Sequence, residues 1–224
     1  MNPELVAALS RALQEAAEDP NVEAVVLAAE GKFWSNGLDL KWVHAHQDQA
    51  HVLLEGANKL MAQLLTFPLP TVAALQGHWC AGGGILGLCC DYRVMNSEKG
   101  FFFVPGVDLG IVYSQFQIEL MKAKLPPTLH TEVIIFNNKK WSAAELLEVR
   151  VIDRAVPSGI VIEEALGLAA ELRPKGRGPA RGALGTIKAR VYKGVLAEME
   201  DGATIEWGSW KGNDRPEQAK KEGA

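Results

Sequence analysis

The segment spanning residues 71–91 constrains the fold of this chain more than any other. It begins with an apolar, β-branched run that ends at Gly77. After a short connection, Gly82, Gly83 and Gly84 open a run with the apolar spacing of a helix. Glycine lets another molecule approach the backbone closely, and a helix start carries unpaired N–H groups and the positive end of the helix dipole. The pattern therefore predicts a helix start that can hold a phosphate, a carboxylate or a developing oxyanion.

Length and composition predict a globular protein with one substantial core. The chain has 224 residues, of which 48% are hydrophobic and 22% charged, and these fractions are ordinary for soluble proteins. The net charge of −4 argues against a nucleic-acid-binding protein, which normally has a basic face. No apolar run reaches the length of a membrane span, so we expect a soluble intracellular protein. Neither end of the sequence carries a recognisable targeting signal.

The three cysteines lie in or beside apolar sequence. Cys80, Cys89 and Cys90 do not form a disulfide framework, and no spacing of Cys and His residues resembles a zinc site. We therefore expect buried thiols in a reducing compartment, and no metal site.

Strands and helices are predicted to alternate along the chain. Asn2 and Pro3 start the first helix, and Ser142 and Glu145 fit a capping box before another. The apolar periodicity predicts further helices at 52–65, 114–124, 126–136, 158–172 and 180–199, and strands at 22–29, 71–77, 92–95, 101–104 and 151–156. Residues 31–41 are predicted to form a loop that leads into a helix, and residues 175–179 a linker. Alternation of this kind indicates an α/β fold with largely parallel strands.

Three sequence blocks resemble the crotonase (enoyl-CoA hydratase/isomerase) superfamily. They lie at 31–41, 76–93 and 105–110, and they occur in the order of that family over residues 2–157. The sequence Ser-Asn-Gly-Leu-Asp-Leu at 35–40 most resembles the Δ3,Δ2-enoyl-CoA isomerase branch. The resemblance implies a spiral of ββα turns over residues 1–157, without the first β-hairpin of the family. It also implies a C-terminal helical region, residues 158–200, that packs subunits into trimers, followed by a polar tail at 201–224.

The resemblance implies that the ligand is a coenzyme A thioester and that no other cofactor is needed. The amides of Leu38 and Gly83 match the two donors that hold the thioester oxygen while an enolate forms. Lys32, Asp39 and Lys41 match positions near the coenzyme A nucleotide, where the lysines could meet its phosphates. Residue types alone allow another interpretation, in which both lysines are solvated surface charges and Asp39 lies at a helix start.

The departures from the family pattern concern the groups that move protons. Leu86 stands where hydratases carry a glutamate, and Gly106 stands where the isomerase branch carries its own. We therefore expect a degenerate acid/base site, with Asp108 as a candidate substitute base or as part of a local turn. Further candidates are His78, more typical of packing, and Tyr113 and Ser114, whereas Asp91 and Arg93 are expected to form a structural ion pair or cap.

A second interpretation of the glycines is a dinucleotide fingerprint. Residues 82–87 satisfy G-x-G-x-x-G, but they do not follow a strand immediately, and no acidic residue ends a following strand at the usual distance. A lone glycine fingerprint is a weak signal.

Two functional hypotheses follow. The first is an enoyl-CoA isomerase-like, acyl-CoA-binding protein of fatty acid metabolism that retains the oxyanion loop. The second is a catalytically inactive pseudoenzyme, a structural subunit of a larger, mitochondrial assembly. By resemblance the compartment is mitochondrial or peroxisomal. Apolar residues after Pro157, and Trp207 and Trp210 in the tail, predict an oligomer, either a homotrimer or a mixed assembly with related chains.

Overall fold

The structure, a computed structural model, describes residues 1–199. The polar tail predicted at 201–224, with Trp207 and Trp210, lies outside the described residues.

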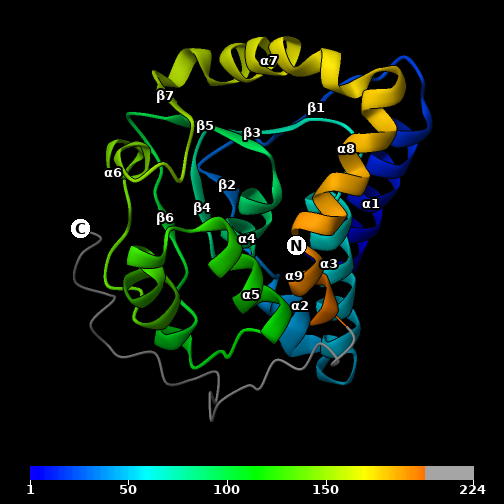
Figure 1. Ribbon diagram of the computed structural model, residues 1–224. Coiled ribbons are helices and arrows are strands. Elements are labelled where there is room, and N and C mark those ends of the chain that lie inside the picture. The colour runs from blue at the N-terminus through cyan, green and yellow to red at the C-terminus, as the bar shows by residue number, and fades with distance from the viewer. Residues whose placement is uncertain (200–224) are drawn as a thin grey trace.

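The described strands form two parallel sheets (Figure 1). The larger sheet has the order β1 (Val25–Ala28), β3 (Thr71–Leu75), β5 (Tyr92–Asn96) and β7 (Arg154–Val156). The smaller sheet has the order β2 (Phe33–Ser35), β4 (His78–Cys80) and β6 (Phe102–Phe103). Along the chain, one strand enters each sheet before the next helical segment begins. The chain therefore advances as a spiral of ββα turns, with the parallel pairing that the sequence predicted.

The helices begin where local signals place them. Asn2 accepts a hydrogen bond from the amide of Leu5 at 2.9 Å, and Ser142 and Glu145 form the predicted capping box. The α-helices of residues 1–199 are α1 (Pro3–Glu18), α2 (Leu40–Ala45), α3 (Ala50–Leu65), α4 (Ala81–Cys89), α5 (Gln115–Lys124), α6 (Ala143–Glu148), α7 (Val161–Leu172), α8 (Gly178–Val191) and α9 (Lys193–Ala197). None of them is long and apolar enough to cross a membrane.

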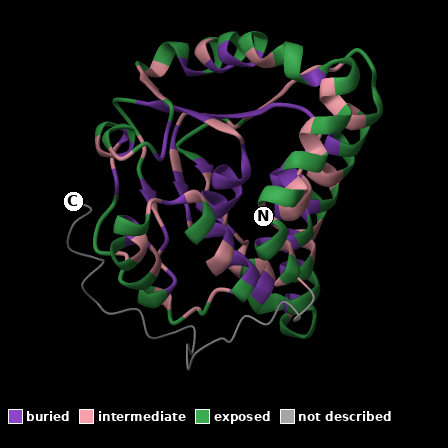
Figure 2. Cartoon of the chain, viewed as in Figure 1, coloured by how far each residue is buried: buried purple, intermediate pink, exposed green. Residues whose placement is uncertain are grey.

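Helices cover both faces of the larger sheet (Figure 2). Helix α7 lies on one face, where Val161 and Ala165 pack against Val72 and Val94. The main core lies on the other face and includes buried residues of α3, α4 and α5. Strand β3 is buried along its whole length, as expected for a strand in a parallel sheet covered by helices.

Several predictions of secondary structure were wrong. Residues 33–35 and 78–80, predicted as a loop and a connection, form β2 and β4, which are too short to show a strand period. The segment 126–136 is a short 3₁₀ turn followed by a π-helix at His130–Ile135.

Asp91 and Arg93 do not pair with each other through their carboxylate and guanidinium groups. Instead, Asp91 pairs with Lys188 and Arg93 with Asp153.

Residues 175–179 are not a linker. A 3₁₀ turn spans Arg173–Gly176, and α8 begins at Gly178. A β-carbon at Gly176 would lie 1.9 Å from the carbonyl oxygen of Glu23, and Arg177 forms an ion pair with the Glu23 carboxylate. This glycine- and arginine-rich segment is therefore docked tightly on the chain that precedes β1.

Arg150 adopts a left-handed backbone conformation, with φ of 58°. Such a conformation is uncommon for residues with a β-carbon, so Arg150 carries a local conformational cost in the turn between α6 and β7.

Candidate active site

The loop that carries Leu38 touches the first turn of α4. A β-carbon at Gly37 would lie 2.8 Å from the Gly82 nitrogen, and one at Gly82 would lie 3.9 Å from the Leu38 nitrogen. Gly37 also has φ of 86°, which other residues adopt only with strain. The structure thus brings the Leu38 amide and the start of α4 together, although 44 residues separate Leu38 from Gly82.

The two amides that the resemblance singled out lie at the edges of regular structure, Leu38 in the loop after β2 and Gly83 in the first turn of α4. The Met1 amino group donates to the Gly37 carbonyl, and the Asp39 amide donates to the Met1 carbonyl at 2.8 Å, so these bonds bracket Leu38 without using its N–H. Gly83 lies in the first turn of α4, where amides have no partner within the helix. No side chain caps this helix at Cys80. These bonds therefore leave the Leu38 N–H unused, whereas Gly83 itself is buried in the first turn of α4.

Gly83 cannot carry a side chain without moving its neighbours. A β-carbon there would lie 2.3 Å from the Ser35 Oγ and 2.6 Å from the Ser35 carbonyl oxygen. A β-carbon at Gly84 would lie 2.9 Å from the Phe102 ring, and a β-carbon at Gly87 would lie 2.9 Å from the Trp79 ring. Internal packing therefore accounts for two of the three glycines that the G-x-G-x-x-G pattern requires, Gly84 and Gly87, and for Gly83 between the first two, which weakens the dinucleotide interpretation.

A cavity of about 110 Å³ lies beside this loop and helix start. It is lined by Asn36, Leu38, Leu40, Met61, Cys80, Ala81, Gly82, Pro105, Leu109, Ile111, Tyr113 and Gln117. The lining is mostly apolar, with Cys80 and Tyr113 as its ionisable side chains. Burial raises the pKa of the Cys80 thiol to about 11 and raises the pKa of the Tyr113 hydroxyl above its ordinary value. Both groups are protonated at neutral pH, so the lining offers proton donors and no carboxylate.

Tyr113 occupies the space in front of Gly106. A β-carbon at Gly106 would lie 2.3 Å from the Tyr113 Cε2 atom and 2.9 Å from the Ile111 carbonyl oxygen. The ring therefore lies where a side chain at residue 106 would begin. A glutamate at residue 106 would have to displace Tyr113, a constraint that the sequence alone did not reveal.

The cavity wall also contains a buried amide that the sequence did not single out. Gln117 donates to the Asn58 side chain at 2.9 Å, and Asn58 donates to the Ser114 Oγ at 3.2 Å. Ser114 also caps α5, so its role here is structural. The Gln117 Oε1 atom has no hydrogen-bond partner among residues 1–199. From the sequence, helical spacing predicts only which face of α5 carries Gln117, and it does not predict that this side chain lines a cavity.

Three of the candidate acid/base positions, Asp108, Leu86 and His78, lie away from this cavity, whereas Tyr113 lines it. Asp108 is exposed and accepts a hydrogen bond from Asn137 at 2.7 Å, and it does not line the cavity. Leu86 is buried and faces a separate groove between α1 and β1. His78 stacks on Phe101 in the smaller sheet, and burial lowers its pKa.

The residues predicted to meet coenzyme A flank the Leu38 loop: Lys32 precedes β2, Asp39 caps α2 and Lys41 lies in the first turn of α2. Lys32 and Lys41 are exposed. The Asp39 carboxylate accepts hydrogen bonds from the amides of Lys41 and Trp42, both at 3.1 Å, and so caps α2. Asp39 therefore has a structural role, while Lys32 is exposed with its ammonium group 5.9 Å from the Phe33 ring centroid, and Lys41 is exposed on α2.

Comparisons with known proteins agree on one family. A family model described as enoyl-CoA hydratase/isomerase matches residues 1–202. The peroxisomal enoyl-CoA delta isomerase 2 of Arabidopsis thaliana is 27% identical over 208 residues, covering 88% of this chain and 84% of the relative. The mitochondrial enoyl-CoA hydratase domain-containing protein 3 of Rattus norvegicus is 31% identical over 185 residues, covering 82% of this chain and 59% of the relative.

The fold is also similar to solved structures. An enoyl-CoA hydratase of Mycobacterium ulcerans matches with a TM-score of 0.80 and 27% identity, covering 90% of this chain and 86% of that one. An enoyl-CoA isomerase of Mycobacterium tuberculosis matches with a TM-score of 0.79 and 27% identity, covering 90% of this chain and 85% of that one. The α/β fold class expected from the sequence is thereby confirmed.

The packing of the glycines predicts opposite effects for two neighbouring substitutions. Gly83→Ala should lower the free energy of unfolding by about 1–3 kcal/mol, because its β-carbon collides with Ser35. Gly82→Ala is the matched control, since its β-carbon would meet no atom closer than 3.6 Å. It should be neutral or stabilise by up to about 1 kcal/mol, because alanine favours helices over glycine. Urea denaturation of both variants measures the difference, and equal effects would contradict this account of the site.

Proposed function

Because the chain belongs to the enoyl-CoA hydratase/isomerase family, we propose that it binds an acyl-CoA thioester in the cavity beside α4. The thioester oxygen accepts hydrogen bonds from the amides of Leu38 and Gly83. The observation that carries this proposal is the contact between the Leu38 loop and the first turn of α4, next to an apolar cavity. Lys32, before β2, and Lys41, in the first turn of α2, are both exposed, and in this proposal they meet the phosphates of the coenzyme A nucleotide.

The chemistry that this site supports is stabilisation of an enolate. Two oriented amides hold the developing negative charge, and each such donor contributes roughly 10²–10³ in rate. Isomerisation also needs a base to move a proton between two carbons. Gly106, Leu86 and the protonated cavity side chains supply no carboxylate. We therefore propose a degenerate acid/base site, with little hydratase or isomerase turnover.

Binding of an acyl-CoA tests the proposed function directly. Calorimetric titration with a medium-chain enoyl-CoA should give a dissociation constant in the micromolar range or tighter. A Lys32→Ala, Lys41→Ala double variant should bind more weakly, and more so at low salt, because exposed charges are screened. Lys59→Ala, which changes a surface lysine of α3, is the matched control. Absence of heat with folded protein at millimolar ligand would rule out the proposal.

The position of Tyr113 determines how a base could be restored. Gly106→Glu alone should give little isomerase activity, because the Tyr113 ring and the Ile111 carbonyl fill the space of the new side chain. Combining it with Tyr113→Ala frees part of that space, and activity should rise by at least ~10². The control carries Gly106→Gln with Tyr113→Ala, which has the same shape without a base, and it should show no rise. High wild-type activity that is lost in Asp108→Asn would instead identify Asp108 as the base.

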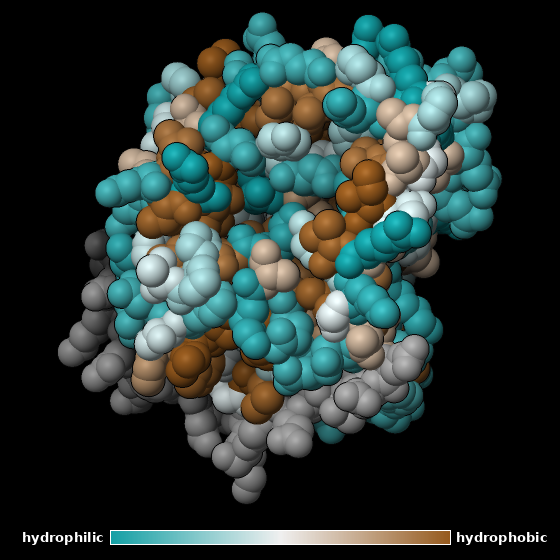
Figure 3. All heavy atoms as spheres, in the orientation of Figure 1, coloured by the Kyte–Doolittle hydropathy of each residue, from teal (hydrophilic) through white to brown (hydrophobic). Residues whose placement is uncertain are grey.

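A second candidate function is that of a structural subunit, and exposed apolar residues favour it. On α8, Ile187 and Val191 are 56% and 68% exposed, and apolar residues gather over this helix in Figure 3. Ile162 and Leu166 on α7 are exposed as well. A second copy of this chain, or a related chain, would cover these helices in a closed assembly. The relatives' peroxisomal and mitochondrial compartments make such an organelle the proposed location.

Light scattering tests this association. The wild type should be an oligomer at micromolar concentration, and an Ile187→Asp, Val191→Asp double variant should shift it toward monomers. Replacing two apolar residues with charges opposes their burial in an interface. The control is Lys175→Asp with Arg190→Asp, which also adds charge but removes no exposed apolar surface. A stable wild-type monomer would contradict the proposal.

A further inference from the structure

A second cavity lies at the opposite end of α4. It has a volume of about 310 Å³ and shares no lining residue with the candidate active site. Its walls come from the N-terminal ends of β3 and β5 and from the ends of α5, α7 and α8. Because α4 has nine residues, the two cavities are separated by roughly 13 Å of helix.

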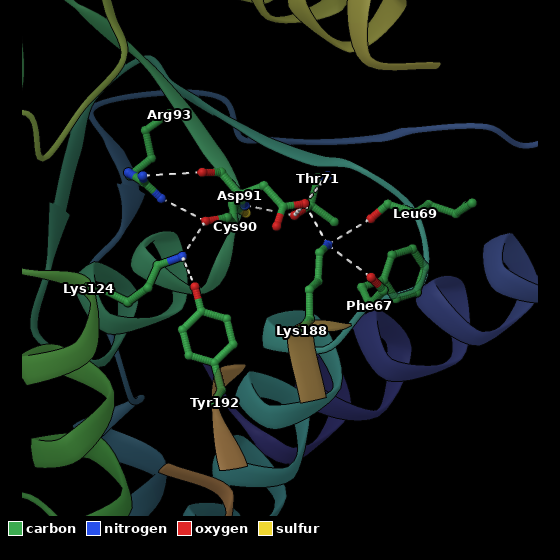
Figure 4. A network of polar contacts seen from close by, with 9 residues as sticks. All are labelled: Phe67, Leu69, Thr71, Cys90, Asp91, Arg93, Lys124, Lys188 and Tyr192. Atoms are coloured by element: carbon green, nitrogen blue, oxygen red, sulfur yellow. Dashed lines mark hydrogen bonds and ion pairs between the residues drawn. The ribbon is translucent and has the colours of Figure 1, made fainter. Parts of the chain in front are cut away.

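The charges around this cavity are not balanced. Lys124, Lys175 and Lys188 line it together with a single carboxylate, that of Asp91. Lys188 uses all three of its donors, bonding to Asp91 at 2.6 Å and to the carbonyls of Phe67 and Leu69 at 2.9 and 3.1 Å (Figure 4). Asp91 therefore already has an ammonium partner.

Lys124 is a partly buried cation of this lining, and within residues 1–199 it has no carboxylate partner. Its ammonium group donates to the Cys90 carbonyl at 3.1 Å and to the Tyr192 hydroxyl at 3.3 Å, and both partners are neutral (Figure 4). No carboxylate lies within 4.0 Å of it among residues 1–199. One of its three donors is unused. A buried ammonium group is costly without an opposite charge, so this site favours an anion.

Burial and the neighbouring charges shift the pKa of the Lys124 ammonium group. Burial and, to a smaller extent, the positive charge of Arg93 together lower its pKa to about 8, while Cys89, Asp91 and Cys90 act in the opposite direction. At pH 7 the ammonium form still predominates. It can therefore serve as counter-charge to an anion under ordinary conditions.

We propose that this cavity binds a small organic carboxylate, with the Lys124 ammonium group and the Tyr192 hydroxyl as its polar anchors. Lys175 lies exposed in the wall, where it attracts the anion. Pro70, Leu172 and Leu184 supply apolar walls for the body of the ligand. A carboxylate with a short apolar body satisfies both parts of this lining. The Cys90 carbonyl that binds Lys124 follows α4, so the occupied cavity contacts the helix that carries Gly83 at its other end.

NMR titration with benzoate tests the proposal, with benzamide as its uncharged analogue. At pH 7, benzoate should cause saturable shifts in the amide signals around Lys124 and Tyr192, and benzamide should bind at least tenfold more weakly. Lys124→Met should weaken benzoate binding at least tenfold, whereas Lys124→Arg should retain it. Lys122→Met is the matched control, because Lys122 lies two residues away and pairs with Glu119 at 2.7 Å.

The pH dependence gives an independent readout. Affinity for benzoate should fall as pH rises above about 8, since the ammonium form of Lys124 is lost. Three results would overturn the proposal: equal binding of benzoate and benzamide, undiminished binding to a folded Lys124→Met variant, or no saturable shifts at tens of millimolar benzoate. None of them bears on acyl-CoA binding, which is measured at the other end of α4.

Discussion

The close approach between the Leu38 loop and the first turn of α4 is the constraint on which the candidate site depends. Two glycines make it possible, because a β-carbon at Gly37 would meet the Gly82 nitrogen and one at Gly83 would meet Ser35. The pairing of β2 with β4 holds the two segments at this distance. The consequence is chemical as well as steric. The loop residue Leu38 and the helix-start residue Gly82 come to line one apolar cavity, and the buried Gly83 follows Gly82 in the first turn of α4.

The opposite end of α4 is held by cations. Arg93 and Lys124 both donate to the Cys90 carbonyl, at 2.7 and 3.1 Å, where the helix dipole is negative. Lys188 then ties α8 to the chain before β3 through the carbonyls of Phe67 and Leu69. The C-terminal helices are therefore part of the scaffold that positions α4, in addition to presenting exposed apolar residues.

The chemical character of the candidate site follows from what fills it. Tyr113 stands in front of Gly106, and burial keeps both Tyr113 and Cys80 protonated. The site thus combines hydrogen-bond donors with an apolar wall, which suits the binding of a thioester oxygen better than the removal of a carbon-bound proton. The proposal of thioester binding with little turnover rests on this combination.

The sequence by itself determined the features that depend on neighbouring residues. Asn2, Pro3 and Ser142 identified their helices because capping bonds span only a few residues, and buried β3 was visible as an apolar run. The glycine blocks identified the family and drew attention to Leu38 and Gly83. The tertiary structure alone decided the features that join distant residues. These are the three-residue strands β2 and β4, the position of Tyr113 over Gly106, and the bond between Lys188 and Asp91, which lie 97 residues apart. Such contacts depend on how the chain packs, and residue type and spacing do not specify which side chains will meet.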